Sequence, residues 1–156
     1  MIHSDIAGPE QAYTNRNYTI NLVDEISGLV NIQFMKNKSE VPTMIKDGIK
    51  EMKNLFRLPT QANAIFQSDG EAIYKSKNVQ NVLEELNLYQ QFSPAYHPER
   101  NGTAERTYRT MFNDARAMLL SSRSPLPVTY YPLAMEHAVL IRNLLPKGKK
   151  KKKNRT

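Results

Sequence analysis

The sequence predicts an α/β fold in which helices flank a mixed sheet. Short apolar or alternating segments, typical of strands, occur at residues 18–23, 30–34, 64–67 and 88–92. Longer segments with apolar residues at helical spacing separate and follow them. Strands that alternate with helices along a chain pack as a sheet covered by helices. At 156 residues the chain is long enough for one domain with a buried core.

The first two of these strands are expected to form a hairpin, because residues 24–28 between them supply a turn. A further strand is expected at the start of the chain, ending near Asp5. Only Met1 to Ser4 precede Asp5, so we expect this first strand to be truncated to about four residues. Such a strand would leave backbone N–H and C=O groups of the neighbouring strands without partners. Each buried group left unpaired lowers the stability of the fold by about 1–3 kcal/mol. We therefore expect a marginal fold.

Four helices are predicted from apolar residues that recur three and four positions apart. They cover residues 39–56, 78–86, 103–121 and 128–145. Ser39 is of a residue type that caps the start of a helix. Pro59 and Pro127 interrupt the chain between helical segments. A loop at 93–101 connects the last strand to the third helix.

The excess of positive charge lies at the end of the chain. The 22 basic and 15 acidic residues give a net charge of +7. Seven basic residues lie beyond residue 146 and no acid follows Glu136, so residues 1–146 carry equal numbers of both. We therefore predict one domain at 1–146 and a disordered basic tail at 147–156, which binds nucleic acid or directs nuclear import. The alternative is a tail that only adds solubility.

Composition excludes several classes of protein. Without cysteine the chain has no disulfide framework and no cysteine-based zinc site. No secretory signal is recognisable, and no apolar run approaches the roughly 18 residues that span a bilayer. We therefore expect the nucleus or the cytoplasm as the location.

Three carboxylates stand out by their spacing. Asp69 directly follows a short apolar strand, and Glu105 opens a helix after thirty-five intervening residues. Asp5 lies upstream of both. Each has an ordinary explanation when taken alone. Asp69 could be a turn residue, Glu105 an acid stabilised by the helix dipole, and Asp5 an exposed acid near a terminus. Together, three carboxylates from two strands and a helix are suited to holding two divalent metals for phosphoryl transfer.

This order and spacing resemble the D,D-35-E signature of retroviral and retrotransposon integrases, and the flanking residues are most similar to the integrases of copia/Ty1-type LTR retrotransposons. The segment 3–9 reads His-Ser-Asp-Ile-Ala-Gly-Pro, similar to the family's His-Ser-Asp-x-x-Gly-Pro. The segment 98–106 resembles Pro-Gln-x-Asn-Gly-x-x-Glu-Arg, with Glu99 in place of the glutamine. After Asp69 the chain departs from the family, because Glu71 and Ile73 replace a glycine and a glutamate. The resemblance extends from residue 2 to about residue 146.

The resemblance implies an RNase H-like fold with a mixed five-stranded sheet. It implies that Asp5, Asp69 and Glu105 are catalytic and bind two Mg²⁺ (or Mn²⁺) ions. The implied reaction is DNA strand transfer, in which a DNA 3′-hydroxyl attacks a phosphodiester of the target. The implied partners are the DNA of the element ends and of the target, and further copies of the chain in an intact integrase.

Candidate DNA-binding residues fall into three groups. The loop before the third helix offers side chains that can stack on bases or contact phosphates. One face of the helix begins with Glu105 and continues with arginines, and the tail adds lysines. They are Tyr96, His97 and Asn101 in the loop, Arg106, Arg109 and Arg116 on the helix, and Lys147, Lys149, Lys150 and Lys151 in the tail.

Two alternatives compete with an active integrase core. One is a degenerate or domesticated fragment that binds nucleic acid without catalysis, favoured by the short first strand, by the lack of the family's His/Cys zinc domain and by the lysine run. The other is an RNase H-type hydrolase on the same fold. The string Asn101-Gly102…Glu105 argues against the hydrolase, because it is typical of integrases.

Overall fold

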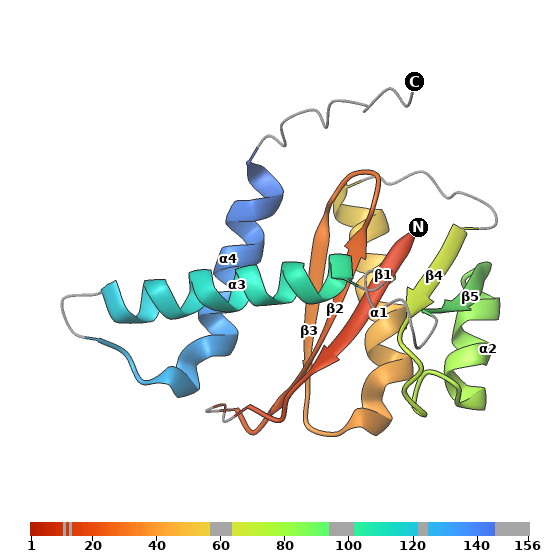
Figure 1. Cartoon of the computed structure of the whole chain (residues 1–156), viewed down its shortest axis with the longest axis horizontal. Coiled ribbons are helices and arrows are strands. Elements are labelled where there is room, and N and C mark those ends of the chain that lie inside the picture. Colours follow the sequence, from red (N-terminus) through yellow and green to blue (C-terminus); the bar gives the residue numbers. More distant parts are fainter. Residues whose placement is uncertain (11, 13, 57–63, 94–101, 122–124, 146–156) are drawn as a thin grey trace.

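The computed structural model describes residues 1–10, 12, 14–56, 64–93, 102–121 and 125–145. Five strands form one mixed sheet in the order β3-β2-β1-β4-β5 (Figure 1). They are β1 (Ile2–Ala7), β2 (Tyr18–Asp24), β3 (Val30–Met35), β4 (Ala64–Ser68) and β5 (Leu88–Phe92). The predicted fold class is confirmed.

The sheet is antiparallel on one side of β1 and parallel on the other. β1 pairs antiparallel with β2, which continues into the predicted hairpin with β3. On its other edge β1 pairs parallel with β4, and β4 pairs parallel with β5. Asp24 forms the hairpin turn by accepting hydrogen bonds from the backbone N–H and the hydroxyl of Ser27, at 2.8 and 2.6 Å.

The expectation of a first strand of about four residues was wrong. β1 has six residues and continues beyond Asp5 to Ala7, and every one of them has a partner in β2. The seven-residue β2 offers hydrogen-bonding groups along the whole length of β1, so the chain stays extended past Asp5. The predicted loss of ladder hydrogen bonds therefore does not occur between β1 and β2. Towards β4, β1 pairs only through Ile2 and His3, so Ala64 and Ile65 have no partner in β1. The marginal stability of the fold stays a prediction.

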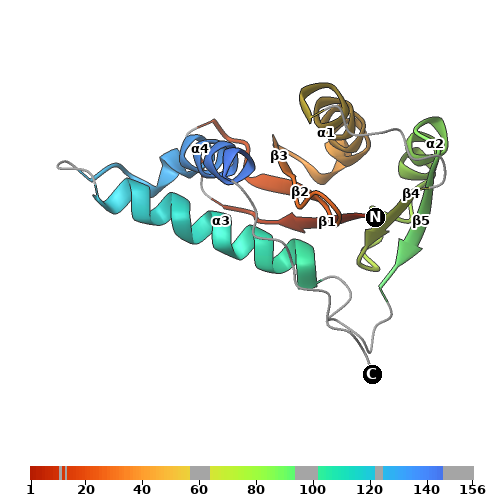
Figure 2. The ribbon, with the colours of Figure 1, turned by 90° about the horizontal axis from the view of Figure 1, so that it is seen from above.

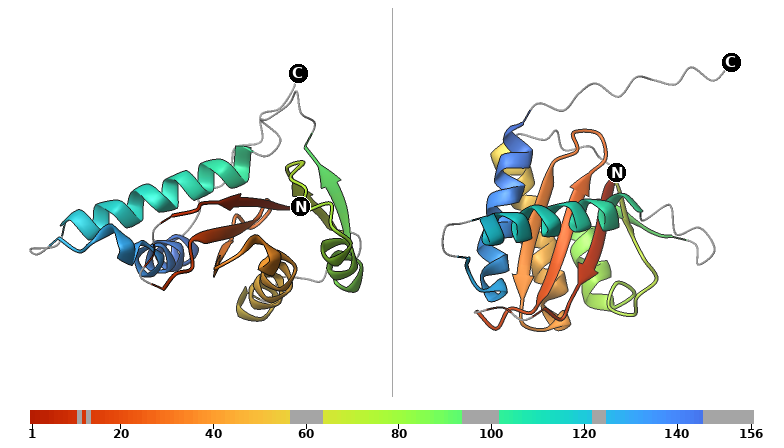
Figure 3. Two further views of the ribbon diagram at one scale, coloured as in Figure 1. Left: turned by 90° about the horizontal axis from the view of Figure 1, so that it is seen from below. Right: turned by 60° about the vertical axis from the view of Figure 1, so that its left-hand side comes forward.

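The helices lie on both faces of the sheet. α1 (Val41–Phe56) and α2 (Lys77–Glu85) cover one face, and α3 (Gly102–Ser121) runs across the strands on the other (Figures 2 and 3). α4 (Tyr131–Leu144) packs against α3 and β3. It follows a 3₁₀ turn, η3, at Val128–Tyr130. Among the described residues, no helix is long and apolar enough to cross a membrane.

The start of α1 differs from the prediction. A 3₁₀ turn, η1 (Lys38–Glu40), precedes the helix, so Ser39 lies within the turn and is not the cap. The Glu40 carboxylate instead accepts hydrogen bonds from the backbone N–H groups of Lys36 and Asn37, at 3.0 and 2.9 Å. The Glu40 side chain is longer than that of serine and reaches the N–H groups of Lys36 and Asn37. The turn therefore begins at Lys38, one residue before Ser39.

Two apolar clusters fill the space between the sheet and the helices. Alternate residues of β2 serve opposite faces, as the period of a strand requires. Ile20 and Leu22 belong to the cluster under α1 and α2, whereas Val23 belongs to the cluster under α3 and α4. The predicted apolar stripe of α3 is confirmed, because Ala104, Met111, Ala115 and Leu119 are buried.

We predict that Gly48→Val destabilises the protein. Gly48 lies on α1 where the helix approaches the sheet, and an added Cβ would lie 2.6 Å from Asn31 Oδ1 and 2.7 Å from Leu22 Cδ1. Overpacking costs about 1–3 kcal/mol, more than the few tenths of a kcal/mol that valine gains over glycine in helix propensity. Urea unfolding would measure the loss. Gly70→Val is the control, since its nearest neighbour would be Lys75 Nζ at 3.7 Å. Equal stability of the two variants would contradict the prediction.

Candidate active site

Two of the three predicted carboxylates come from neighbouring parallel strands. β1 and β4 pair in register at Ile2 with Phe66 and at His3 with Gln67. The same register continued by two residues brings Asp5 level with Asp69, just beyond the end of β4. Residues at the same level of adjacent strands point to the same face of the sheet. The alternation along β1 therefore directs Asp5 to the face that α3 covers.

Glu105 reaches the same region from the first turn of α3. This end of α3 lies over β1, and the rest of the helix extends across β2 and β3 (Figure 3). Glu105 and Asp5 line one small cavity of about 270 Å³, together with Tyr108, Arg109 and Phe112. The cavity thus joins a carboxylate of the central strand, a carboxylate of the helix and a basic side chain.

The carboxylates interact electrostatically. Burial, reinforced by the charges of Asp69 and Glu105, raises the pKa of Asp5 to about 6, although a hydrogen bond from the backbone of Ile6 acts in the opposite direction. Burial also raises the pKa of Asp69; the backbone N–H of Glu71 opposes this by donating to Asp69 Oδ1 at 3.1 Å. Three acids that repel one another on a half-buried surface form an environment that a cation would stabilise.

The donor set fits a divalent cation in its chemistry. Carboxylate oxygens are the ligands that Mg²⁺ and Mn²⁺ prefer, and the repulsion felt by Asp5 is the kind that a shared cation offsets. The described residues nevertheless contain no group of three or more His, Asp or Glu side chains positioned to hold one ion. The three acids therefore interact through their charges without forming a ready-made chelating cluster.

A lysine holds the turn that follows Asp69. Lys38 Nζ lies 2.9 Å from Glu71 Oε2, in a partly exposed ion pair. Its positive charge also opposes the rise that burial causes in the pKa of Asp69. Glu71 is one of the two positions at which the sequence departs from the copia/Ty1 pattern, so the charged pair connects this departure to the start of α1. Sequence reasoning did not identify Lys38, because 32 residues separate it from Glu71 and no spacing connects them.

A second contact supports the same end of the sheet. Ser4 Oγ and the Tyr74 hydroxyl form a hydrogen bond of 2.7 Å, and both side chains are fully buried. Tyr74 is the aromatic residue of the motif that begins at Asp69. It packs in the cluster under α1 and α2, so its role here is to join the chain after Asp69 to β1.

The predicted basic residues divide into those that the structure describes and those that it does not. Arg106, Arg109 and Arg116 are exposed on α3, on the same helix as Glu105. The predicted loop residues Tyr96, His97 and Asn101 lie outside the described residues. So do Lys147, Lys149, Lys150 and Lys151, and with them the predicted tail at 147–156.

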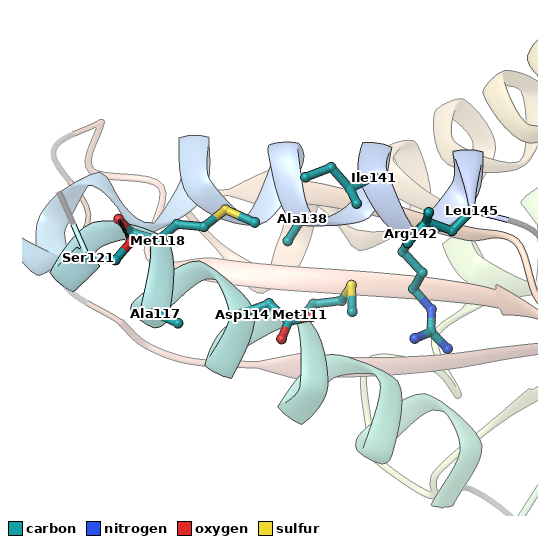
Figure 4. A pocket seen from close by; sticks show the side chains of 9 residues that line it. All are labelled: Met111, Asp114, Ala117, Met118, Ser121, Ala138, Ile141, Arg142 and Leu145. Carbon is teal, nitrogen blue, oxygen red and sulfur yellow. Dashed lines mark hydrogen bonds between the residues drawn. The ribbon is translucent and has the colours of Figure 1, made fainter.

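A larger cavity lies away from the carboxylates. It has a volume of about 600 Å³ and is formed between the second half of α3 and the end of α4 (Figure 4). Apolar side chains such as Met111, Met118 and Ile141 line most of it, with Asp114 and Arg142 as its charged residues. It contains none of the three predicted acids, so we do not assign the reaction to it.

The fold matches that of known structures. The five-stranded mixed sheet with flanking helices is the RNase H-like fold of retroviral integrase catalytic cores. A chain of the simian T-cell lymphotropic virus intasome matches with a TM-score of 0.69 at 20% identity, over 93% of this chain and 48% of that one. The catalytic core domain of BIV integrase matches with a TM-score of 0.65 at 16% identity, over 94% and 85%. At these identities the likeness establishes the fold.

The sequence relatives are Pol polyproteins of Ty1/copia-type retrotransposons, which confirms the resemblance inferred from the motifs. The chain is 28% identical over 148 residues to the retrovirus-related Pol polyprotein from transposon RE2 of Arabidopsis thaliana, covering 93% of the chain. It is 26% identical over 157 residues to the transposon Ty1-DR4 Gag-Pol polyprotein of Saccharomyces cerevisiae, covering 99%. The chain spans about 10% of the length of each relative. No protein-family model matches it.

We predict that Asp5→Asn makes the fold more stable at neutral pH in buffer without divalent ions. Below about pH 3 the Asp5 carboxyl is protonated in both the folded and the unfolded chain. As pH rises, the unfolded chain ionises first, near its ordinary pKa of 3.8, and the folded one only near 6. The folded state therefore loses stability between about pH 4 and pH 6 and does not regain it above.

The expected gain of Asp5→Asn at pH 8 is about 1–2 kcal/mol, allowing for partial solvent screening, and it should vanish near pH 3. Urea unfolding of both proteins across this range measures it. Asp47→Asn, at an exposed position on α1, is the control substitution. A wild-type protein at least as stable as Asp5→Asn at pH 8 would contradict the assignment of a strained carboxylate.

Proposed function

We propose that this chain is the DNA-integration core of a retrotransposon and catalyses metal-dependent strand transfer. The observation that carries the proposal is the approach of Asp5, Asp69 and Glu105, from two parallel strands and a helix, to one face of the sheet. The sequence relatives support it, because they are retrotransposon Pol polyproteins. The structural neighbours support it through the fold they share with this chain.

In the proposed reaction the 3′-hydroxyl of the element DNA attacks a phosphorus atom of the target. A new phosphorus–oxygen bond forms and the bond to the target's own 3′-oxygen breaks. The attacking hydroxyl gives its proton to solvent, and the departing 3′-oxygen takes up a proton from solvent. One phosphodiester replaces another, so no energy-supplying co-reactant is needed. Divalent ions, when bound, supply activation of the hydroxyl and stabilisation of the leaving oxygen. Asp5, Asp69 and Glu105 supply the oxygen ligands for them.

The remaining side chains of the site bind and orient DNA. Arg109 lines the cavity that contains Asp5 and Glu105, so it is suited to contact a phosphate beside the reacting one. Arg106 and Arg116 extend the basic surface along α3. Phosphate contacts of this kind give affinity and register but little sequence preference. We also propose that strand transfer involves further copies of the chain and takes place on target DNA in the nucleus.

The second candidate function is nucleic-acid binding without catalysis. One observation favours it: the described residues hold no ready-made group of three metal ligands. An inactive core would keep the fold and the exposed arginines of α3 while lacking a site that captures ions. Activity measurements therefore separate the two functions, since only the first requires Glu105 beyond its contribution to folding.

We predict that Glu105→Gln abolishes joining of a labelled element-end oligonucleotide to target DNA in Mg²⁺ or Mn²⁺. The substitution keeps size and hydrogen-bonding capacity but removes the charge that holds a cation. Joining should fall by at least about 100-fold, while DNA retention on a filter stays within about 2-fold. Glu84→Gln, at an exposed position on α2, is the matched control. Joining by Glu105→Gln at the wild-type rate would refute the catalytic assignment, and inactivity of the wild type with normal DNA retention would favour the second function.

We predict that most non-specific DNA affinity resides in the tail. Because residues 1–146 carry equal numbers of acidic and basic residues, the net charge of +7 belongs to 147–156. Full engagement of these charges gives a slope of about −6 in a plot of log K against log salt. Deleting 147–156 should reduce the slope to a small remaining value, contributed by the arginines of α3. An unchanged slope would instead assign the affinity to the folded domain.

A further inference from the structure

A buried side-chain amide joins the sheet to the first turn of α3. Asn21 lies on β2 and is 1% exposed. Its Nδ2 donates a hydrogen bond of 2.8 Å to the backbone carbonyl of Ala104, which is 83 residues away in the sequence. Ala104 directly precedes Glu105. On the sheet, Asn21 is the antiparallel partner of Asp5. One side chain therefore connects the strand that pairs with Asp5 to the turn that carries Glu105.

This connection starts from a rigid element. β2 is hydrogen-bonded to β1 on one side and to β3 on the other, so Asn21 is held along both edges of its strand. The first turn of a helix is its least constrained part, because its N–H groups have no partners within the helix. A hydrogen bond from the sheet to the Ala104 carbonyl therefore limits how far Glu105 can move from Asp5.

Packing alone does not explain an asparagine at this position. Asn21 Oδ1 is buried and has no hydrogen-bond partner among the described residues. An unsatisfied buried acceptor is destabilising, and a leucine, which has the same branching and number of side-chain heavy atoms, would avoid that cost beside the apolar cluster under α3. What asparagine adds at this position is therefore the N–H donor of its amide, which binds the carbonyl in the turn that carries Glu105.

We propose that Asn21 is a positioning residue for strand transfer: by holding the Ala104 carbonyl, it keeps the first turn of α3 close to β1, so that Glu105 stays within reach of an ion shared with Asp5. This inference rests on the proposed function above. Asn21 itself does not need to touch the ions or the DNA. Residues that orient the ligands of a metal typically change its affinity 10- to 100-fold when they are replaced.

The experiment measures Mn²⁺ binding to the full chain by calorimetry, without DNA, for the wild type and for Asn21→Leu. We expect Asn21→Leu to weaken Mn²⁺ binding by about 10- to 100-fold. Asn31→Leu is the matched control: Asn31 is 8% exposed on β3 and donates to Glu51 Oε2 at 2.8 Å, on the face that α1 covers. Its Mn²⁺ affinity should match that of the wild type. Equal affinities for all three proteins, or equal losses in both variants, would overturn the proposal.

Hydrogen exchange supplies a readout that is independent of the ion. In Asn21→Leu the amides of residues 106–109 should exchange faster, whereas those of residues 111–119 should match Asn31→Leu. Unchanged exchange at 106–109 would overturn the proposal. If leucine prevents folding, Asn21→Val, with a smaller side chain suited to strands, takes its place.

Failure of this inference is distinguishable from failure of the proposed function. A wild type that binds Mn²⁺ but joins no DNA, with weaker binding in Asn21→Leu, would reject strand transfer and retain the positioning role. A wild type that joins DNA, with Asn21→Leu joining equally well and binding Mn²⁺ equally tightly, would retain strand transfer and reject the role of Asn21.

Discussion

The pairing of β1 with its two neighbours is the constraint on which the candidate site depends. β1 occupies the centre of the sheet, with antiparallel β2 on one edge and parallel β4 on the other. The parallel register brings Asp5 level with Asp69, and the antiparallel register places Asn21 beside Asp5. A shift of one residue in either pairing would turn a polar side chain toward the apolar cluster on the opposite face. The apolar residues of β1 and β2 thus fix the positions of the acids.

The packing that creates the site also makes it electrostatically costly. Half-burial of Asp5 near Asp69 and Glu105 raises the pKa of Asp5, which means that the folded chain resists placing three charges together. Tyr108 and Phe112 connect the acids to the apolar cluster under α3 and α4, because both pack against that cluster and also line the cavity of Asp5 and Glu105. Sites that bind cations commonly lower the stability of the fold in this way, since repulsion between the ligands is relieved only when positive charge is present.

Two contacts counteract the tendency of the acids to separate. The ion pair of Lys38 with Glu71 holds the turn after Asp69, and the amide of Asn21 holds the turn that carries Glu105. The first is partly exposed and so contributes little free energy, but it restricts the path of the chain. The second is buried and connects elements that are far apart in the sequence. Lys38 and Asn21 lie outside the segments that carry the acids, and each holds a residue close to one of them: Glu71, two residues after Asp69, and Ala104, directly before Glu105.

Periodicity and turn residues were sufficient to predict the α/β class and the order of the elements, whereas Asp5 became a candidate ligand only through the resemblance to copia/Ty1-type integrases. Alternating segments such as Val30–Met35 and the apolar stripe of α3 carry this information locally, because strand and helix periods are properties of adjacent residues. Tertiary structure decided the length of β1, which depends on the hydrogen-bonding groups of β2 and not on the residues before Asp5. It also decided the partners of Lys38 and Asn21, since contacts across 33 and 83 residues exist only once the sheet and its helices have packed.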